Sequence, residues 1–343
     1  MKRILIGIIL GLIFSLTSGT AALAAEAAED SSFILFPFWW IILALVVLSG
    51  LVIIDVQILA FLARRKKTKV KVGDIDIYYE IHGKGEPLVL IPGLGGNISN
   101  FARIIPTLAE NYRVIAMDNR GAGQTDKPDI PYTMEMMAED VAGLLNFVRA
   151  EKAHIFGISM GGMIAQHFAL EYPQRVTSLI LGSTTPGGPN SVGFEETVNT
   201  VNPEQRKNLS PEEDARAIMS MVYTKKFINN NPELIEELVA QRVQNPPDPV
   251  GRERQFQAAS AHDTFERLPE IEAPTLVIAG DEDTVVSPEN SQILTSRIPN
   301  SKLEILKGVG HGFVTEASED TSRIVLKFLT EINQETSPVE EKE

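Results

Sequence analysis

Ser159 is the residue of this chain that is best placed to act as a nucleophile. It lies in Gly157-Ile158-Ser159-Met160-Gly161, between a buried β run, His154–Phe156, and a helical stretch, Gly161–Leu170. A turn this sharp needs small neighbours and holds the serine in a strained backbone conformation. The hydroxyl then projects from the carboxyl edge of a sheet, above a helix N-terminus that stabilises negative charge. The position of the pattern between a strand and a helix is what indicates a nucleophile.

A serine hydroxyl needs a base that takes its proton, and the chain has 5 histidines. His311 is the best candidate, because Gly308-Val309-Gly310-His311-Gly312-Phe313 is a glycine-rich loop after a predicted strand. A side chain from such a loop can reach over the sheet edge. His262 could touch a substrate, but we expect it at the surface. The remaining three are expected to be structural: His82, His154 and His167.

The base in turn needs an acid that fixes its tautomer and stabilises the imidazolium. Asp281 and Asp283 both follow the predicted strand Pro274–Ile278, within the segment Ala279-Gly280-Asp281-Glu282-Asp283. Spacing alone does not separate these two aspartates. Either one gives the chain order serine, aspartate, histidine.

Two backbone N–H groups are expected to stabilise the negative charge that develops on a carbonyl oxygen under attack. One is the N–H of Met160, directly after the serine. The other comes from the loop Pro92-Gly93-Leu94-Gly95-Gly96, in which Leu94 is the expected donor. A phosphate-binding function of this loop is disfavoured, because it lacks a Gly-Lys-Ser/Thr ending and no acidic residue follows at ribose distance.

Strands that alternate with helices after residue 67 would hold these residues in place. The pattern predicts an α/β protein with a mostly parallel, doubly wound sheet of eight strands. A polar–apolar hairpin is followed by short apolar runs, which are typical of strands buried on both faces. The predicted strands are Lys69–Val72, Ile75–Ile81, Pro87–Ile91, Tyr112–Met117, Ala153–Phe156, Val176–Leu181, Pro274–Ile278 and Lys302–Ile305, with helices near 98–109, 134–150, 160–172, 287–297 and 317–333.

Residues 185–270 interrupt this alternation and predict a helical cap. They are rich in Glu, Gln, Asn, Arg and Pro, and they contain helical patches such as Glu212–Tyr223 and Pro232–Val243 but no convincing strand. The cap would be inserted between two strands of the sheet. The predicted core has two parts and is followed by a disordered acidic tail: residues 68–184 and 271–333 for the core, and 334–343 for the tail.

The residues before the core have the composition of membrane segments. Lys2-Arg3 and the apolar run Ile4–Leu16 are typical of a signal sequence, so residues 1–25 are predicted to be a signal-like or first membrane segment. The stretch Phe33–Leu62 contains one ionisable residue, Asp55. It exceeds the roughly 20 residues that a helix needs to cross a bilayer, which predicts a transmembrane helix at 33–63.

Positive charges predict the orientation of this helix. Arg64-Arg65-Lys66-Lys67 follows the apolar stretch directly, and such clusters stay on the cytoplasmic side. Lys2-Arg3 agrees with the same orientation. We therefore expect the protein in the cell membrane, with the domain after residue 67 facing the cytoplasm.

Composition excludes several other classes of protein. The chain has no Cys, which rules out disulfides, thiolate metal sites and a cysteine nucleophile. Its net charge of −14 disfavours nucleic acid as a partner, because polyphosphates are repelled. We expect a small-molecule substrate and no metal or cofactor.

Residues 68–333 resemble the α/β-hydrolase superfamily, in the branch of small esterases, enol-lactonases and cofactor-free haloperoxidases. Five segments carry the resemblance, in the order that the family has. They are Ile91-Pro92-Gly93-Leu94-Gly95, Asp118-Asn119-Arg120-Gly121-Ala122-Gly123-Gln124-Thr125-Asp126, Gly157–Gly162, Gly280–Asp283 and Gly310-His311-Gly312.

The resemblance implies a choice between the aspartates and a reaction. In that family the acid is usually the third residue after the glycine, which favours Asp283 over Asp281. Pro92-Gly93 replaces the usual His-Gly, and Ser159 excludes the members with an aspartate nucleophile. The implied activity is hydrolysis of an ester or lactone through an acyl-enzyme. Carbon–carbon bond hydrolysis by the same triad, or a catalytically silent scaffold or sensor at the membrane, are the alternatives.

Overall fold

The computed structural model describes residues 68–336. The predicted membrane segments, 1–25 and 33–63, and residues 337–343 of the predicted tail lie outside the described residues. Among the helices between residues 68 and 336, none is long and apolar enough to cross a bilayer. The membrane anchor therefore stays a prediction.

A single sheet of 8 strands forms the centre of the described part, in the order β1-β2-β4-β3-β5-β6-β7-β8. The hairpin β1–β2 and the pair β2–β4 are antiparallel, and the other pairs are parallel. This confirms the predicted mostly parallel, eight-stranded sheet. The strands are β1 Thr68–Val72, β2 Ile75–His82, β3 Glu86–Ile91, β4 Tyr112–Met117, β5 Ala153–Ile158, β6 Val176–Gly182, β7 Thr275–Gly280 and β8 Ser301–Leu306.

Helices cover both faces of the sheet. Successive residues of a strand point to opposite faces, so each strand contributes side chains to both cores. In β3, Val89 and Ile91 pack in the core that contains helices α4 and α5, whereas Leu88 and Leu90 pack in the core that contains α3 and α13. These strands are therefore apolar throughout instead of alternating. The helices of the core are η1 Ile98–Phe101, α3 Ile105–Leu108, α4 Met134–Phe147, α5 Met160–Glu171, η2 Pro173–Arg175, α11 Glu289–Arg297, α12 Phe313–Glu316 and α13 Ser318–Thr336.

Two predicted helix boundaries differ from the structure. The single helix expected near 98–109 is two short helices, η1 and α3. Pro106 lies in the first turn of α3, where a missing N–H is tolerated, but a continuous helix would not accommodate it. At the other end, α13 runs to Thr336, three residues into the segment 334–343 that was predicted as tail.

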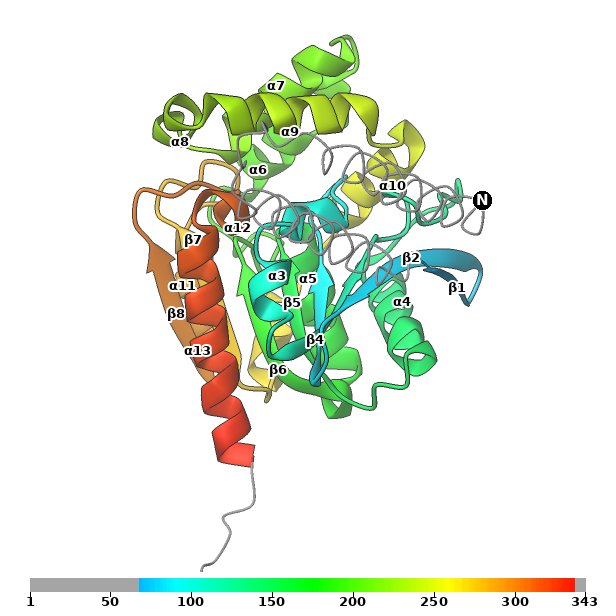
Figure 1. Cartoon of the computed structure of the whole chain (residues 1–343), viewed down its shortest axis with the longest axis vertical. Coiled ribbons are helices and arrows are strands. Elements are labelled where there is room, and N and C mark those ends of the chain that lie inside the picture. Colours follow the sequence, from blue (N-terminus) through cyan, green and yellow to red (C-terminus); the bar gives the residue numbers. More distant parts are fainter. Residues whose placement is uncertain (1–67, 337–343) are drawn as a thin grey trace, which may run out of the picture. The chain divides into compact units, whose positions relative to one another are not determined.

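Most helices between β6 and β7, α6 to α10, form a layer above the carboxyl ends of the strands (Figure 1), whereas η4 packs beside α5 and α11. Ser210 and Glu213 form a capping box at the start of α7, and Asp248 caps α10. Buried Ala215 and Met219 of α7 pack with Ile235 and Val239 of α9. The elements are α6 Phe194–Val201, η3 Pro203–Arg206, α7 Pro211–Val222, α8 Lys225–Asn230, α9 Pro232–Gln244, α10 Pro249–Ser260 and η4 Phe265–Glu270.

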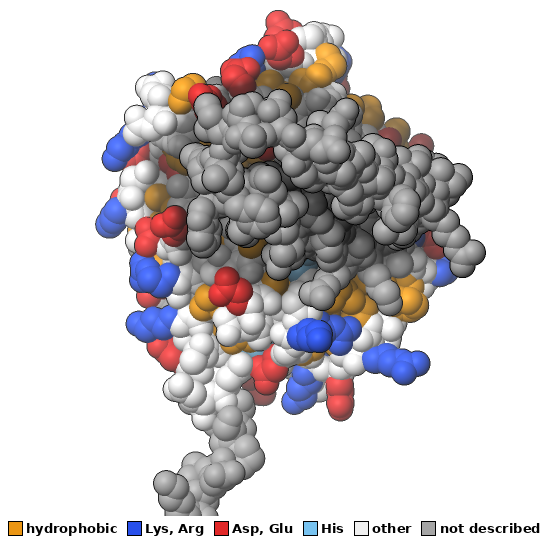
Figure 2. All heavy atoms as spheres, in the orientation of Figure 1, with side chains coloured by type: hydrophobic (Ala, Val, Ile, Leu, Met, Phe, Trp, Pro, Cys, Tyr) orange, Lys and Arg blue, Asp and Glu red, His pale blue; other side chains and the backbone are white. Residues whose placement is uncertain are grey.

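Charged side chains of both signs are scattered over the described surface seen in Figure 2. Asp and Glu side chains lie among the Lys and Arg side chains there.

Candidate active site

Ser159 occupies the turn between β5 and α5 with φ 54° and ψ −123°. Its N–H donates to the carbonyl of Gly182 at 2.8 Å, which ties the turn to β6. A Cβ on Gly161 would lie 2.1 Å from the carbonyl oxygen of Ile91, and one on Gly157 would lie 2.0 Å from that of Gly161. The glycines on both sides of Ser159 are therefore required by close packing, and the positive φ is held by the surrounding structure.

His311 and Asp283 form a hydrogen-bonded pair at the same edge of the sheet. His311 Nδ1 lies 2.8 Å from Asp283 Oδ2. The other carboxylate oxygen accepts from the N–H groups of Val285 and Val286, each at 2.9 Å. With Asp283 held in this way, Nδ1 donates and Nε2 keeps the lone pair that a base requires.

Asp281 lies in a different environment from Asp283. Its Oδ1 accepts from the N–H of Gly308 at 2.6 Å, and its Oδ2 lies 3.3 Å from Lys307 Nζ. Asp281 therefore stabilises the turn after β8, whereas Asp283 contacts the imidazole of His311. The structure thus brings Asp283, and not Asp281, to the histidine.

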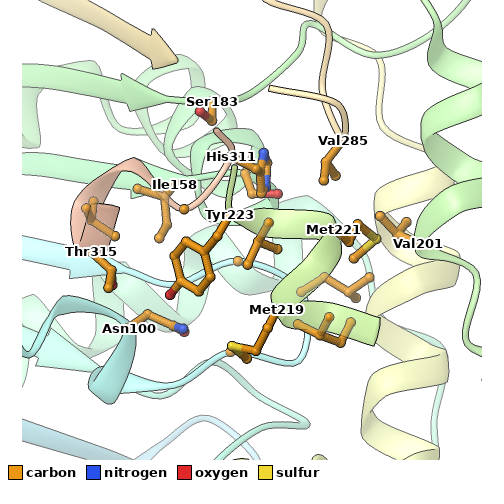
Figure 3. A pocket seen from close by; sticks show the side chains of 18 of the residues that line it. Asn100, Ile158, Ser183, Val201, Met219, Met221, Tyr223, Val285, His311 and Thr315 are labelled. Carbon is orange, nitrogen blue, oxygen red and sulfur yellow. The ribbon is translucent and has the colours of Figure 1, made fainter. Parts of the chain in front are cut away.

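A cavity of about 170 Å³ lies between the sheet edge and the cap, and both Ser159 and His311 line it. Gly93 and Leu94 line it from the loop after β3. Figure 3 shows Tyr223 at the centre of the cavity wall, with its hydroxyl toward Asn100 and Thr315. Apolar side chains make up much of the rest of the lining: Ile158, Val201, Ile218, Met219, Met221, Val222, Val285 and Val314.

The expected oxyanion donors, Leu94 and Met160, are both next to this cavity or to its serine. Within residues 68–336 neither backbone N–H has a hydrogen-bond acceptor. The loop that carries Leu94 is fixed on both sides, because Asn119 Nδ2 donates to the Pro92 carbonyl at 2.8 Å and the Gly95 N–H donates to Gln255 Oε1 at 2.8 Å. Two free donors on a fixed backbone are what stabilisation of an oxyanion requires.

The segment 118–126 supports the loop from below. Asp118 accepts from the N–H groups of Ile98 and Gln124 at 2.9 and 2.8 Å. Burial raises the pKa of Asp118. Arg120 forms a buried two-point ion pair with Asp140 at 2.6 and 2.7 Å. These residues hold the shape of the site and do not line its cavity.

The cap is tied directly to the histidine loop through Glu316. One Glu316 oxygen accepts from the N–H groups of Gly310, at 3.1 Å, and Thr224, at 3.3 Å, and the other accepts from the Thr224 hydroxyl. On the other side of His311, the Gly312 N–H donates to the Val222 carbonyl at 2.7 Å. The end of α7 and the residues flanking His311 thus form one hydrogen-bonded unit.

The surface position expected for His262 is wrong. His262 is 2% exposed, and its Nδ1 lies 3.2 Å from His167 Nε2 while its Nε2 lies 3.2 Å from the Thr185 carbonyl. Burial lowers the pKa of His262 to about 3, and it also lowers the pKa of His167. Because the ring is enclosed by α5 and the loop after β6, it packs inside the protein. His82 and His154 contact Glu80 and Ser178, respectively.

Three arginines in the cavity wall were not identified from the sequence. They surround Asp214, and all of them line the cavity: Arg206, Arg242 and Arg252. They come from η3, α9 and α10, so no local spacing connects them. Ser183, with φ 43° and a buried hydroxyl that has no partner in the described part of the chain, also lines the cavity.

A serine on a strained strand-to-helix turn, at the carboxyl edge of a mostly parallel sheet, is the arrangement that defines the α/β-hydrolase class. The family model described as the alpha/beta hydrolase fold matches residues 86–317. The chain belongs to this family and is a hydrolase of the α/β type.

Known proteins with different substrates are similar to this chain. RutD of Azorhizobium caulinodans, which is assigned to carbamate hydrolysis, is 32% identical over 76% of this chain and 98% of its own length. The 2-hydroxy-6-oxononadienedioate/2-hydroxy-6-oxononatrienedioate hydrolase 1 of Dechloromonas aromatica is 32% identical, covering 80% of this chain and 98% of its own. The solved structure of the enol-lactonase from Burkholderia xenovorans LB400 is 25% identical with a TM-score of 0.68, covering 77% of this chain and 100% of that one.

Proposed function

We propose that this chain is a serine hydrolase that cleaves a carboxylic ester or a lactone through an acyl-enzyme. Ser159 is the nucleophile, His311 is the general base and Asp283 orients it. The observation that carries the proposal is the 2.8 Å contact between His311 Nδ1 and Asp283 Oδ2, beside a cavity that Ser159 and His311 both line. The enol-lactonase structure that resembles this chain supports the same reaction class.

The first half of the reaction forms the acyl-enzyme. Ser159 Oγ bonds to the carbonyl carbon of the substrate while His311 Nε2 takes the hydroxyl proton. The carbonyl oxygen becomes negatively charged and accepts from the N–H groups of Leu94 and Met160. The C–O bond to the leaving alcohol then breaks, and the proton passes from His311 to that oxygen. In a lactone the released hydroxyl stays attached to the acyl group.

The second half of the reaction returns the enzyme to its starting state. Water gives a proton to His311 Nε2 and adds to the acyl carbon, and the bond to Ser159 Oγ breaks as the serine recovers its proton. Asp283 stays ionised throughout and stabilises the imidazolium. All of these steps use side chains and N–H groups of the chain itself.

Carbon–carbon bond hydrolysis by the same residues is a second candidate. The similarity to the Dechloromonas aromatica hydrolase favours it, since this relative matches over 80% of the chain. Relative rates on a simple aryl ester and on a vinylogous diketone would separate the two reactions. Ester hydrolysis that is faster by orders of magnitude is the expected result.

A fluorophosphonate probe tests whether the serine is activated at all. We expect covalent labelling of the intact protein at Ser159 and none in Ser159→Ala. Ser183→Ala is the matched control, because Ser183 lines the same cavity but lies after β6. Its labelling should persist. A protein that stays unlabelled would instead be the silent scaffold or sensor.

We also propose that residues 33–63 anchor the protein in the cell membrane, with the hydrolase facing the cytoplasm. The proposal is supported by the apolar stretch Phe33–Leu62 and by the four cations that follow it, Arg64–Lys67. These residues lie outside the described part of the chain. The experiments that test the anchor are given in the Discussion.

A further inference from the structure

Three arginines of the cap converge on one carboxylate. Asp214, on α7, lies 3.0 Å from Arg206 Nε, 3.3 Å from Arg242 Nη2 and 3.5 Å from Arg252 Nη1. The three guanidinium groups and the carboxylate therefore leave an excess of positive charge in the wall of the cavity. No Asp or Glu of the described residues lines this cavity to offset it.

The excess charge is shielded from water. The side chains of Arg242 and Arg252 are 18% and 13% exposed. Burial lowers the pKa of both guanidinium groups, and Arg206 lowers it further in each case. Arginine nonetheless stays protonated in proteins, so the partly desolvated, like-charged guanidinium groups cost the folded state free energy. A bound anion would offset that cost.

One of the arginines has a buried hydrogen-bond donor without an acceptor. Arg206 donates from its two Nη atoms to the carbonyls of Thr200 and Val201. By contrast, Arg242 Nε is buried and has no partner within residues 68–336. Among the described residues, the Arg252 side chain has one hydrogen-bond partner, Asp214 at 3.5 Å. If the cluster only held the cap helices together, we would expect the buried Arg242 donor to be satisfied.

The cluster lies close to the proposed oxyanion donor. A Cβ on Gly95, the residue after Leu94, would be 3.7 Å from Arg252 Cγ. The wall shared with Ser159 and His311 is otherwise largely apolar. A ligand in the cavity would therefore meet the nucleophile, an apolar stretch and the guanidinium groups.

We propose that Arg242 and Arg252, held in place by Asp214, bind a carboxylate of the substrate. The substrate class is thus an ester or lactone whose acyl chain carries a free carboxylate beyond its reacting carbonyl. Guanidinium groups match the planar geometry of a carboxylate, which accepts two parallel hydrogen bonds. This inference rests on the proposed function, since it names the substrate of the same site.

A matched pair of substrates tests the inference. Mono-4-nitrophenyl glutarate and its methyl ester differ only in the methyl group that masks the carboxylate. We expect kcat/KM of the native protein to be at least about tenfold higher for the free acid, chiefly through a lower KM. Arg242→Gln and Arg252→Gln should each reduce this ratio about tenfold. Equal kcat/KM values for the two esters in the native protein would overturn the inference.

Arg216→Gln is the matched control for loss of a cap arginine. Arg216 joins α7 to α9 through Glu236 but is exposed and does not line the cavity. The ratio of kcat/KM for the free acid to that for the methyl ester should therefore be the same in Arg216→Gln as in the native protein. Variants that lose activity on both esters by the same factor, with the ratio unchanged, would show that Arg242 and Arg252 are only structural. Arg252→Lys, which keeps the charge, should show a ratio between those of Arg252→Gln and the native protein.

Binding without turnover separates this inference from the proposed reaction. Calorimetry on the full-length Ser159→Ala variant should detect glutarate, and Arg242→Gln in that background should weaken binding about tenfold. Inorganic phosphate should bind more weakly than glutarate, and tighter binding of phosphate would contradict the carboxylate assignment. Glutarate binding by a protein that the fluorophosphonate does not label would contradict the proposed reaction but support the carboxylate-binding site.

Discussion

Asp281 and Asp283 are two residues apart, yet the same substitution should affect them very differently. Asp283→Asn should lower kcat by about four orders of magnitude, because an asparagine favours the wrong imidazole tautomer. Asp281→Asn should lower it less than tenfold, since that carboxylate accepts from Gly308 at the turn after β8. Steady-state rates on an aryl ester measure both, with circular dichroism as the control for folding. A larger loss from Asp281→Asn would move the acid to that residue.

The residues of the site differ in how far the sequence predicts them. Ser159 and His311 stand out because each lies in a short glycine-rich segment between predicted elements. The spacing left Asp281 and Asp283 open, and only the family resemblance favoured Asp283, because both follow the same strand. The arginines around Asp214 were missed because a contact among four separate cap elements leaves no pattern along the chain.

The buried histidine pair between α5 and the loop after α10 predicts acid sensitivity of the fold. Burial lowers the pKa of His262 from its ordinary 6.5 to about 3. Between these values the unfolded chain binds a proton that the folded chain does not. Stability therefore falls as the pH drops from 6.5 toward 3, by at most about 1.4 kcal/mol per pH unit for this group.

Urea unfolding at pH 7 and pH 4.5 measures this effect. His262→Gln keeps a polar side chain but cannot take up the proton, so its free energy of unfolding should fall less over that range than that of the native protein. Comparing the two proteins cancels the contribution of carboxylates that also titrate over this range. Identical pH dependence in both proteins would exclude His262 as a source of the acid sensitivity.

At the scale of elements, the core is far more predictable than the cap. Every predicted strand was found, because strands buried on both faces are apolar runs with sharp ends. The single helix expected near 98–109 was wrong, because Pro106 interrupts it. A proline is tolerated in the first turn of a helix, where Pro106 lies in α3, but not in the interior. In the cap, α6, α8 and α10 were not singled out, since polar helices differ little in composition from loops.

At the scale of the whole molecule, removal of residues 1–67 should leave a folded, active hydrolase. The sheet begins at Thr68, so this truncation keeps all five pairs between β1 and β2. Deletion of residues 1–74 is the matched control, because it also removes β1 and uncovers Ile75 and Ile77 of β2. Size-exclusion chromatography and rates on an aryl ester check both. Aggregation of the shorter deletion would show that the core needs its N-terminal segment.

The same truncation should release the protein from membranes. The intact chain should sediment with them and resist high salt, since a spanning helix is held by apolar burial and not by charge. Protease added to sealed cells should not reach the cap if Arg64–Lys67 are cytoplasmic. Digestion of the hydrolase from outside would reverse the proposed orientation.

The hydrogen bonds of Glu316 couple the position of the cap to the position of the loop that carries His311. Gly310 and Gly312, on either side of His311, are both hydrogen-bonded into the unit that includes Val222 and Thr224. Lifting this end of α7 would break those bonds and free the histidine backbone. The backbone position of His311 therefore depends on where this end of the cap lies.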